Sequence, residues 1–311
     1  MKKNPWVTLL VLLFVFGTLF VFLVGSSVVN LFGQSPVRVS AKNSILHMEV
    51  TGVIMDGRKF IKNLKKYSED KHIKAIVVSI NSPGGSVGPS QEIYSELMRV
   101  KTQLNKPLII HSSSIMASGG YYIAAAGDKI VVQPGTLTGS IGVIMSFANL
   151  EKLYDWAKIQ RYSITTGRYK DSGAEYRAMR EDEKALFQEM LNDVLLQFKE
   201  AVAKGRNLKL DQVTKYADGR VMTGKQAVEV GFADQLGSLE DAFKLAASTA
   251  GIKDYDVFEP PKKRPSLLEA FSSEDDDDGT VKFDKTIEGL ANRILKTDMM
   301  NRPMYLMPGV L

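Results

Sequence analysis

Two short apolar runs, each followed by a glycine-rich loop, constrain the fold of this chain more than any other feature. AIVVSI at 75–80 leads into NSPGGSVGPS, and PLIIH at 107–111 leads into SSSIMASGG. Short runs of β-branched and aliphatic residues are typical of buried parallel strands. Helical spacing follows at 90–104 and a third apolar run at 128–134. The pattern therefore predicts an α/β domain with a mostly parallel sheet and flanking helices.

Composition argues against several kinds of site. The 311 residues include no cysteine and only three histidines, His47, His72 and His111. We therefore expect no disulfide, no thiolate ligand, no metal and no cofactor. The net charge of +5 is mild, and no basic stripe is interleaved with aromatic residues. For that reason we expect no nucleic acid partner.

The N-terminus predicts a membrane anchor. Residues 6–24 carry no charge, and Lys2 and Lys3 precede them. About 20 apolar residues span a bilayer as a helix, and lysines favour the cytoplasmic side. A cleaved signal peptide ending near VGS at 24–26 is the alternative. The expected topology is a single-pass cell-membrane protein whose catalytic domain is extracytoplasmic, on the periplasmic or outer face.

Composition also divides the rest of the chain. A linker rich in small and polar residues precedes the α/β pattern, and an acidic run, EDDDD at 274–278, follows it. We interpret the run as a solvated link. The expected parts are a cytoplasmic N-terminus at 1–5, the anchor at 6–26, the linker at 27–43, the α/β domain at 44–260 and a C-terminal tail with the acidic segment at 261–311.

The two glycine-rich loops suggest chemistry at one edge of the sheet. NSPGG at 81–85 fits a simple turn or an oxyanion hole, and it lacks the lysine that a phosphate-binding loop requires. Ser118, before Gly119 and Gly120, fits either a helix N-cap or a nucleophile on a strand-to-helix turn. If the preceding strands are neighbours, both loops meet where open α/β sheets bind ligands.

A serine nucleophile needs a base, and the residues alone leave its identity open. His111 ends the strand that leads to Ser118, and no histidine follows Ser118. A lysine kept neutral by burial is the alternative. The candidate lysines after Ser118 are Lys129, Lys152, Lys158, Lys170 and Lys184.

Several motifs in order resemble one family. They are NSPGGS, MASGGYYIAAAGD, TLTGSIGVI, the GRYKD loop and DGRVMTGKQAVEVGFAD, together with the N-terminal anchor. Over about residues 44–260 the chain resembles bacterial signal peptide peptidase A of the short form. That family consists of Ser/Lys serine endopeptidases with a Clp-protease-like fold of the crotonase superfamily.

The resemblance implies roles for particular residues. They are Ser118 as nucleophile, Lys170 as general base, Ser140 as the residue that orients the lysine, and Gly84, Gly85 and Gly119 as the oxyanion hole. It also implies a membrane-tethered, dome-like homo-oligomer, a tetramer or octamer, with its sites facing inward. The implied substrates are signal peptides already released from their precursors. The acidic run departs from the family pattern.

Three alternatives remain at this stage. The chain could resemble a membrane serine peptidase that cuts one membrane-protein partner, an inactive scaffold that binds peptides, or an acyl-CoA enzyme of the crotonase type. Two smaller hypotheses concern other segments. We expect DGRVMTG at 218–224 to form a turn at a subunit contact, and the apolar end YLMPGVL to enter a neighbouring subunit's cleft as a substrate mimic. Tyr121 and Tyr122 are expected to pack within a helix.

Overall fold

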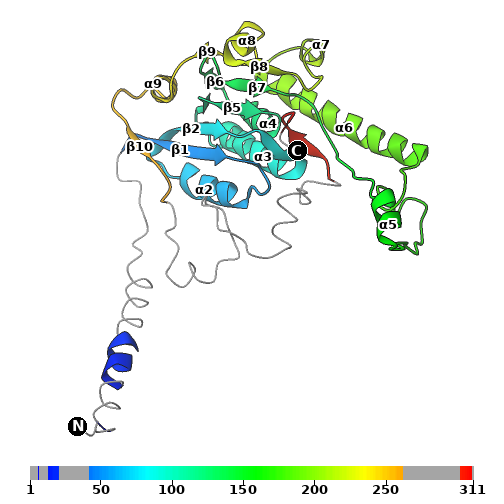
Figure 1. The fold of residues 1–311 in the computed structure, drawn as a ribbon. Coiled ribbons are helices and arrows are strands. Elements are labelled where there is room, and N and C mark those ends of the chain that lie inside the picture. Colours follow the sequence, from blue (N-terminus) through cyan, green and yellow to red (C-terminus); the bar gives the residue numbers. More distant parts are fainter. Residues whose placement is uncertain (1–5, 7–12, 21–41, 262–301, 310–311) are drawn as a thin grey trace. The chain divides into compact units, whose positions relative to one another are not determined.

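The computed structural model describes residues 6, 13–20, 42–261 and 302–309 (Figure 1). The chain divides into two compact units, Met1–Ser40 and Ala41–Leu311. Residues 13–20 of the first unit are helical. Within the described ranges, no helix has both the length and the apolar character that a membrane span needs. Most of the predicted anchor, the linker up to residue 41 and the acidic run lie outside those ranges.

A parallel sheet forms the centre of the second unit. Its strand order is β10-β1-β2-β4-β6-β9, and each neighbouring pair is parallel. The strands are β1 Ser44–Thr51, β2 Ile73–Asn81, β4 Leu108–Ser112, β6 Lys129–Val132, β9 Gln235–Leu236 and β10 Asp256–Phe258. The three predicted apolar runs correspond to β2, β4 and β6. The predicted α/β class with a parallel sheet is therefore confirmed.

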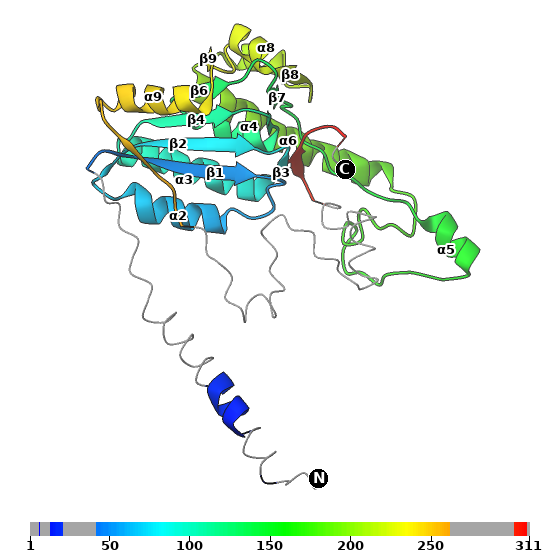
Figure 2. The ribbon, with the colours of Figure 1, turned by 60° about the vertical axis from the view of Figure 1, so that its left-hand side comes forward.

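Helices cover both faces of this sheet. The helices described in the second unit are α2 Arg58–Ser68, α3 Val87–Gln103, α4 Gly119–Ala124, α5 Glu151–Ala157, α6 Glu181–Arg206, α7 Leu210–Thr214, α8 Gly224–Glu229 and α9 Leu239–Thr249, of which α5 lies apart from the sheet. Ile45 and Val77 pack against α9. Leu46, whose side chain is on the other face of β1, is paired with Phe258 in the β1–β10 register. The ring centroid of Phe258 is 5.0 Å from that of Tyr67 in α2. Figure 2 shows α9 and α2 on different sides of β1 and β2.

Two small sheets lie beyond the carboxyl edge of the central sheet. One contains β5 Ile115–Ala117, β7 Leu137–Gly139 and β8 Val221–Thr223, and the other pairs β3 Gly84–Ser86 with β11 Met304–Leu306. The loops after β2 and β4 are joined there, because Ser82 N donates to Ile115 O at 2.9 Å and Ala117 N donates to Ser82 O at 3.1 Å. The prediction that the two glycine-rich loops meet is confirmed.

Residues 145–180, which we call the arm, connect β7 to α6. Figures 1 and 2 both show α5 beyond the first turn of α6 and apart from the central sheet. No residue of α5 is buried. The base of the arm is fixed by the rings of Phe147 and Phe187, whose centroids are 4.8 Å apart. The arm is thus anchored at its base, while every residue of α5 is exposed or only partly covered.

Candidate active site

Ser118 stands on a strained turn between β5 and α4. Its φ of 51° and ψ of −115° lie outside the regions that side chains favour. A non-glycine residue in such a conformation costs about 1–3 kcal/mol and persists only where its surroundings impose it. Here Ser118 N donates to Gly139 O, and Tyr122 N donates to Ser118 O, each at 2.8 Å. A serine held on a sharp strand-to-helix turn is the backbone geometry of many serine nucleophiles.

The hydroxyl of Ser118 does not cap the helix. Ser118 occupies the N-cap position of α4, but its side chain accepts no hydrogen bond there. Ser118 is fully buried, and its Oγ has no hydrogen-bond partner among the described residues. Leaving a buried hydroxyl unpaired costs about 1–3 kcal/mol. The capping interpretation of Ser118 is therefore wrong, and the orphaned Oγ fits a group that waits for a reaction partner.

Gly84, Gly85 and Gly119 form a cradle without side chains beside Ser118. A methyl group built on Gly84 would overlap the carbonyl oxygen of Tyr305 and lie 2.8 Å from Gly119 N. One built on Gly119 would lie 3.1 Å from Gly85 N and 3.2 Å from the same Tyr305 oxygen. The structure therefore brings the three predicted oxyanion glycines together around one carbonyl oxygen.

That oxygen belongs to the C-terminal tail, which lies in the cleft as an antiparallel strand. Figure 2 shows the C-terminal strand β11, in red, beside β3, and Tyr305 is opposite Gly85 in the register of these two strands. Met307 N donates to Pro83 O at 2.8 Å. Because hydrogen-bonded and non-hydrogen-bonded pairs alternate along antiparallel strands, Tyr305 and Gly85 form the next hydrogen-bonded pair. On its other side, β11 exchanges hydrogen bonds with Ile144 at 2.9 and 3.0 Å. The tail enters a cleft as expected, but the cleft belongs to its own chain.

The side chain of Tyr305 fills an aromatic pocket. Its ring stacks on Tyr122 at 5.1 Å and contacts Phe198 at 4.7 Å, and its hydroxyl donates to Val194 O at 3.2 Å. Burial raises the pKa of Tyr305 well above its usual range, so the phenol stays neutral. Tyr121 packs in the core against Phe232 as expected, whereas Tyr122 also lines this pocket. No local sequence pattern indicated the pocket, because its walls come from α4 and α6.

Ser140 is a direct neighbour of Ser118. Ala117 and Gly139 are paired in the parallel β5–β7 register, so the two serines follow paired strands at the same level. Ser140 also has a φ of 51°, and it is buried. Its backbone N donates to Arg220 O at 2.8 Å. Ser140 thus follows its strand at the same level as Ser118 follows β5, and its role in orienting the lysine stays a prediction.

Lys170 does not meet Ser118 within this chain. It lies exposed in the arm, where its backbone N donates to Gly167 O at 3.1 Å. Within the described ranges its amine makes no hydrogen bond or ion pair, and the Oγ of Ser118 is likewise unpaired. The role of Lys170 as base therefore stays a prediction, and a single chain in this conformation does not form the dyad.

A buried carboxylate fixes the segment that follows Lys170. Glu183, fully buried, accepts from Arg177 at 2.6 Å and from the Arg180 guanidinium at 2.7 Å. Arg177 also pairs with Asp171 at 3.1 Å. The hydrogen bond from Arg177 is the main cause that lowers the pKa of Glu183 to about 2. Because Asp171 is the next residue after Lys170, this network sets the position of the predicted base.

His111 is not placed as the base of Ser118. Its Nε2 is buried and unpaired in the described structure, as is the Ser118 Oγ. Burial, with a smaller contribution from nearby His47, lowers the pKa of His111 to about 4. An imidazole with that pKa is neutral at pH 7 and is a weak base. The hypothesis that His111 activates Ser118 finds no support in these contacts.

A second hydrogen-bonded chain runs Ser79–His47–Glu259. His47 Nε2 is 2.9 Å from Ser79 Oγ, and His47 Nδ1 is 2.7 Å from Glu259 Oε1. The order of groups is that of a catalytic triad. However, Ser79 lies within β2, which is paired with a strand on each side, so no oxyanion donor is left beside it. We assign this chain to structure: it ties the segment after β10 to β1.

No metal-binding group of three or more histidine, aspartate and glutamate side chains occurs in the ranges that the structure describes. The candidate chemistry at this site consists of a strained serine, backbone donors and a bound peptide strand. Such an arrangement suits nucleophilic attack on a peptide carbonyl.

Comparison with known families agrees with that geometry. Residues 101–253 match the model of peptidase family S49, and residues 45–138 match the model of Clp protease. The second match supports a Clp-protease-like α/β fold for the sheet and its flanking helices. Together, the two matches cover β1 to β7, the Ser118 turn and the arm.

Several named proteins are similar over most of this chain. A Synechocystis sp. protein, named as a protease, is 40% identical over 232 residues, which are 73% of this chain and 83% of that protein. An Enterococcus faecium protein named for signal peptide peptidase SppA is 35% identical over 233 residues, which are 71% of this chain and 67% of that protein. The chloroplastic serine protease SPPA of Arabidopsis thaliana is 31% identical over 81% of this chain and 37% of its own length.

Proposed function

The chain belongs to peptidase family S49 and is a serine endopeptidase of the signal peptide peptidase A type, and on that premise we propose how it works. We propose that Ser118 is the nucleophile, that Lys170 is the general base, and that released signal peptides are the substrates. We further propose that the enzyme is anchored in the cell membrane with its catalytic domain outside the cytoplasm.

One observation carries the proposal for Ser118. A peptide carbonyl, that of Tyr305, lies in the cradle of Gly84, Gly85 and Gly119, and Gly119 directly follows Ser118, whose buried hydroxyl is unpaired among the described residues. Its strand is held on both sides by main-chain hydrogen bonds, which is how an added strand is recognised without regard to most of its side chains. A substrate bound in the same register presents its scissile carbonyl to Ser118.

The reaction follows from this geometry. Ser118 Oγ attacks the carbonyl carbon while the amine of Lys170 takes its proton, and the N–H groups of Gly85 and Gly119 stabilise the oxyanion. The C–N bond then breaks, and the lysine ammonium gives its proton to the leaving amine. Water, deprotonated by the same lysine, attacks the acyl-enzyme. The ester bond to Ser118 breaks, and the lysine ammonium returns the proton to Ser118 Oγ. The products are a peptide with a new amino terminus, released in the first step, and a peptide acid.

Lys170 must lose its proton before it can act as a base. Desolvation lowers a lysine pKa, because burial disfavours the charged form. Lys170 is exposed in the single chain, so another surface has to cover it. We propose that the arm of one subunit delivers Lys170 to Ser118 of a neighbour. The exposed apolar residues of the arm support this: Trp156 is 79% exposed, Tyr162 78% and Ile164 94%.

The substrate class follows from the cleft and the family. The aromatic pocket around Tyr305 favours a large apolar side chain on the acyl side of the cut bond. Released signal peptides carry apolar cores and can be extended, whereas folded proteins present few free strands. The apolar run at 6–24 supports a location where such remnants accumulate.

A peptide panel tests this proposal. Full-length protein in detergent is offered released signal peptides, the same peptides with the apolar core replaced by serine, and folded proteins. We expect cleavage of the first group after aromatic or large aliphatic residues. Cleavage of a single intact membrane protein, with signal peptides untouched, would support the narrower membrane peptidase instead.

Substitutions at Lys170 test the base. Lys170→Arg should be as inactive as Lys170→Ala, because a guanidinium cannot be deprotonated in a protein. The rate of the wild type should rise with pH as its base is deprotonated, whereas neither variant should show measurable turnover at any pH. An active Lys170→Arg enzyme would assign the base to another group.

A further inference from the structure

The exposed face of α2 is strongly basic. Arg58, Lys59, Lys62, Lys65 and Lys66 are all exposed, and Arg58–Ser68 contains no acidic residue. Their spacing of three and four residues places them on one side of the helix. The opposite side of α2 is apolar and carries Leu64 and Tyr67, which are buried. The helix therefore presents a continuous positive stripe, which we call the basic face.

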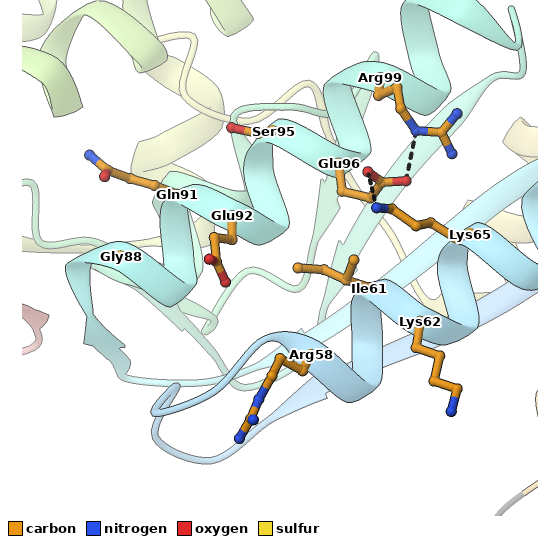
Figure 3. A pocket seen from close by; sticks show the side chains of 10 residues that line it. All are labelled: Arg58, Ile61, Lys62, Lys65, Gly88, Gln91, Glu92, Ser95, Glu96 and Arg99. Carbon is orange, nitrogen blue, oxygen red and sulfur yellow. Dashed lines mark hydrogen bonds and ion pairs between the residues drawn. The ribbon is translucent and has the colours of Figure 1, made fainter.

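The groove between α2 and α3 borders this face but is partly neutralised. Figure 3 shows the groove, whose volume is about 890 Å³, with Lys65 directed toward Glu96. Glu96 is 3.8 Å from Lys65 and 2.8 Å from Arg99. Arg58 is paired with Asp56. In Figure 3, Lys62 points away from α3. Lys62 makes no ion pair with any residue that the structure describes, in contrast to Lys65 in the groove.

The chain leaves the described structure at one end of α2 and returns at the other. Before residue 262, Phe258 contacts Tyr67 in the last turn of α2, and Glu259 is tied to His47. After residue 301, Met304 pairs with Ser86. The Oγ of Ser86 is 3.7 Å from the Sδ of Met55, and Met55 lies three residues before the start of α2. Residues 262–301 therefore connect two points that flank the basic helix.

These residues contain five consecutive acidic side chains, Glu274–Asp278. Extended chain spans about 3.3–3.6 Å per residue, so the stretch from Pro261 to Glu274 reaches about 40 Å, whereas the whole of α2 is about 16 Å long. We propose that Glu274–Asp278 docks on the basic face of α2 of the same chain. The position of both ends, the reach and the opposite charges all favour this occupant over a separate partner.

Docking gives the acidic run a function. It shortens the free connection to β11 and thereby raises the effective concentration of the tail in the cleft. Because exposed charges are screened over about 10 Å at 0.1 M salt, the docking weakens as ionic strength rises. This consequence rests on the proposed peptidase function of the cleft. The docking itself does not, so the two can be tested separately.

A disulfide trap tests the docking without any catalytic readout. The natural chain has no cysteine, so two introduced cysteines report only on each other. Lys62→Cys and Asp276→Cys are combined in full-length protein that also carries Ser118→Ala, which prevents self-cleavage. The matched control replaces Lys62→Cys by Lys244→Cys, an exposed lysine of α9 on the other side of the sheet.

Under mild oxidation at low salt, we expect the Lys62/Asp276 pair to close within one chain at least ten times faster than the control pair. In 1 M NaCl this advantage should fall to less than threefold. Equal rates for the two pairs at low salt would overturn the proposal. So would a disulfide that forms only between chains, seen as a dimer band, because it would assign the run to a second copy's α2.

Discussion

The two halves of the candidate site differ in how completely one chain builds them. The turn at Ser118 is buried and strained, and a peptide strand already occupies its glycine cradle. The arm that carries Lys170 is exposed: α5 has no buried residue, and Ile164 is 94% exposed. The nucleophile side is thus determined by local backbone and core packing. The base side is left open, and only its root is fixed by the Glu183 network.

This difference has a physical consequence. A strained serine costs stability in every chain, whether or not it reacts. In the proposed mechanism, Lys170 acts as a base only where another surface covers it. On that mechanism, activity depends on the assembly of subunits. The predictions that follow probe each side of this comparison.

The largest loss of activity is expected from a substitution at Ser118. Ser118→Ala should lower kcat/KM by about 10⁴-fold or more, because no other described group can form the acyl-enzyme. Peptide hydrolysis and labelling by a fluorophosphonate probe both measure it. The fold should be unchanged, since a buried orphan hydroxyl is removed. A Ser118→Ala enzyme that keeps about one hundredth of the wild-type rate would move the nucleophile elsewhere.

The next effect concerns the cradle. Gly84→Ala should lower kcat by about 10²- to 10³-fold, the usual loss when the oxyanion no longer reaches one backbone donor. The new methyl group would occupy the position of the bound carbonyl oxygen. Gly52→Ala is the matched control, because Gly52 also has a positive φ, of +70°, and a Cβ there meets no atom within 4 Å. Equal kinetics for the two variants would exclude the cradle from catalysis.

A smaller effect is expected at the root of the arm. Glu183→Gln keeps the shape of the side chain but removes a charge that Arg177 and Arg180 share, so the free energy of unfolding should fall by about 2 kcal/mol at pH 7. Activity should fall with it, since Asp171 and Lys170 follow the network. Urea denaturation and peptide hydrolysis measure the two changes. Glu189→Gln, an exposed residue of α6, is the control.

The pH dependence of that variant follows from the lowered pKa of Glu183. A carboxyl group with a pKa of about 2 in the folded chain and an ordinary value of 4.5 stabilises the fold fully above pH 4.5. This contribution is lost as the pH falls from 4.5 toward 2. The wild type should therefore lose more stability than Glu183→Gln over this interval. Parallel stability curves for the two proteins would contradict the assignment.

The smallest effect is expected from the tail. A chain that ends at Asn301 lacks β11, so added peptides no longer compete with Tyr305 for the cleft. We expect kcat/KM for a signal peptide to rise severalfold, with an intermediate rise for Tyr305→Ala. Initial rates and size-exclusion chromatography measure activity and assembly. If both are the same as in the full chain, the tail does not occupy the cleft in solution.

The Ser118 side of the site was easier to predict from the sequence than the Lys170 side. The apolar runs that became β2 and β4, and the glycines around Ser118, mark a site because local composition determines buried strands and tight turns. Lys170 came from the family resemblance alone, since nothing local distinguishes it from other loop lysines. The pairing of β11 with β3 joins residues more than 200 positions apart, so no short pattern reveals it. The Tyr305 pocket depends on the same distant contact.

Subunit complementation tests the central claim most directly. Ser118→Ala and Lys170→Ala chains, each inactive alone, are co-expressed with different tags and purified as mixed oligomers. If Lys170 of one chain serves Ser118 of the next in a ring, about a quarter of the sites in a random 1:1 mixture regain both groups, and activity returns to about a quarter of the wild-type rate. A mixed oligomer that stays as inactive as either parent would contradict the account.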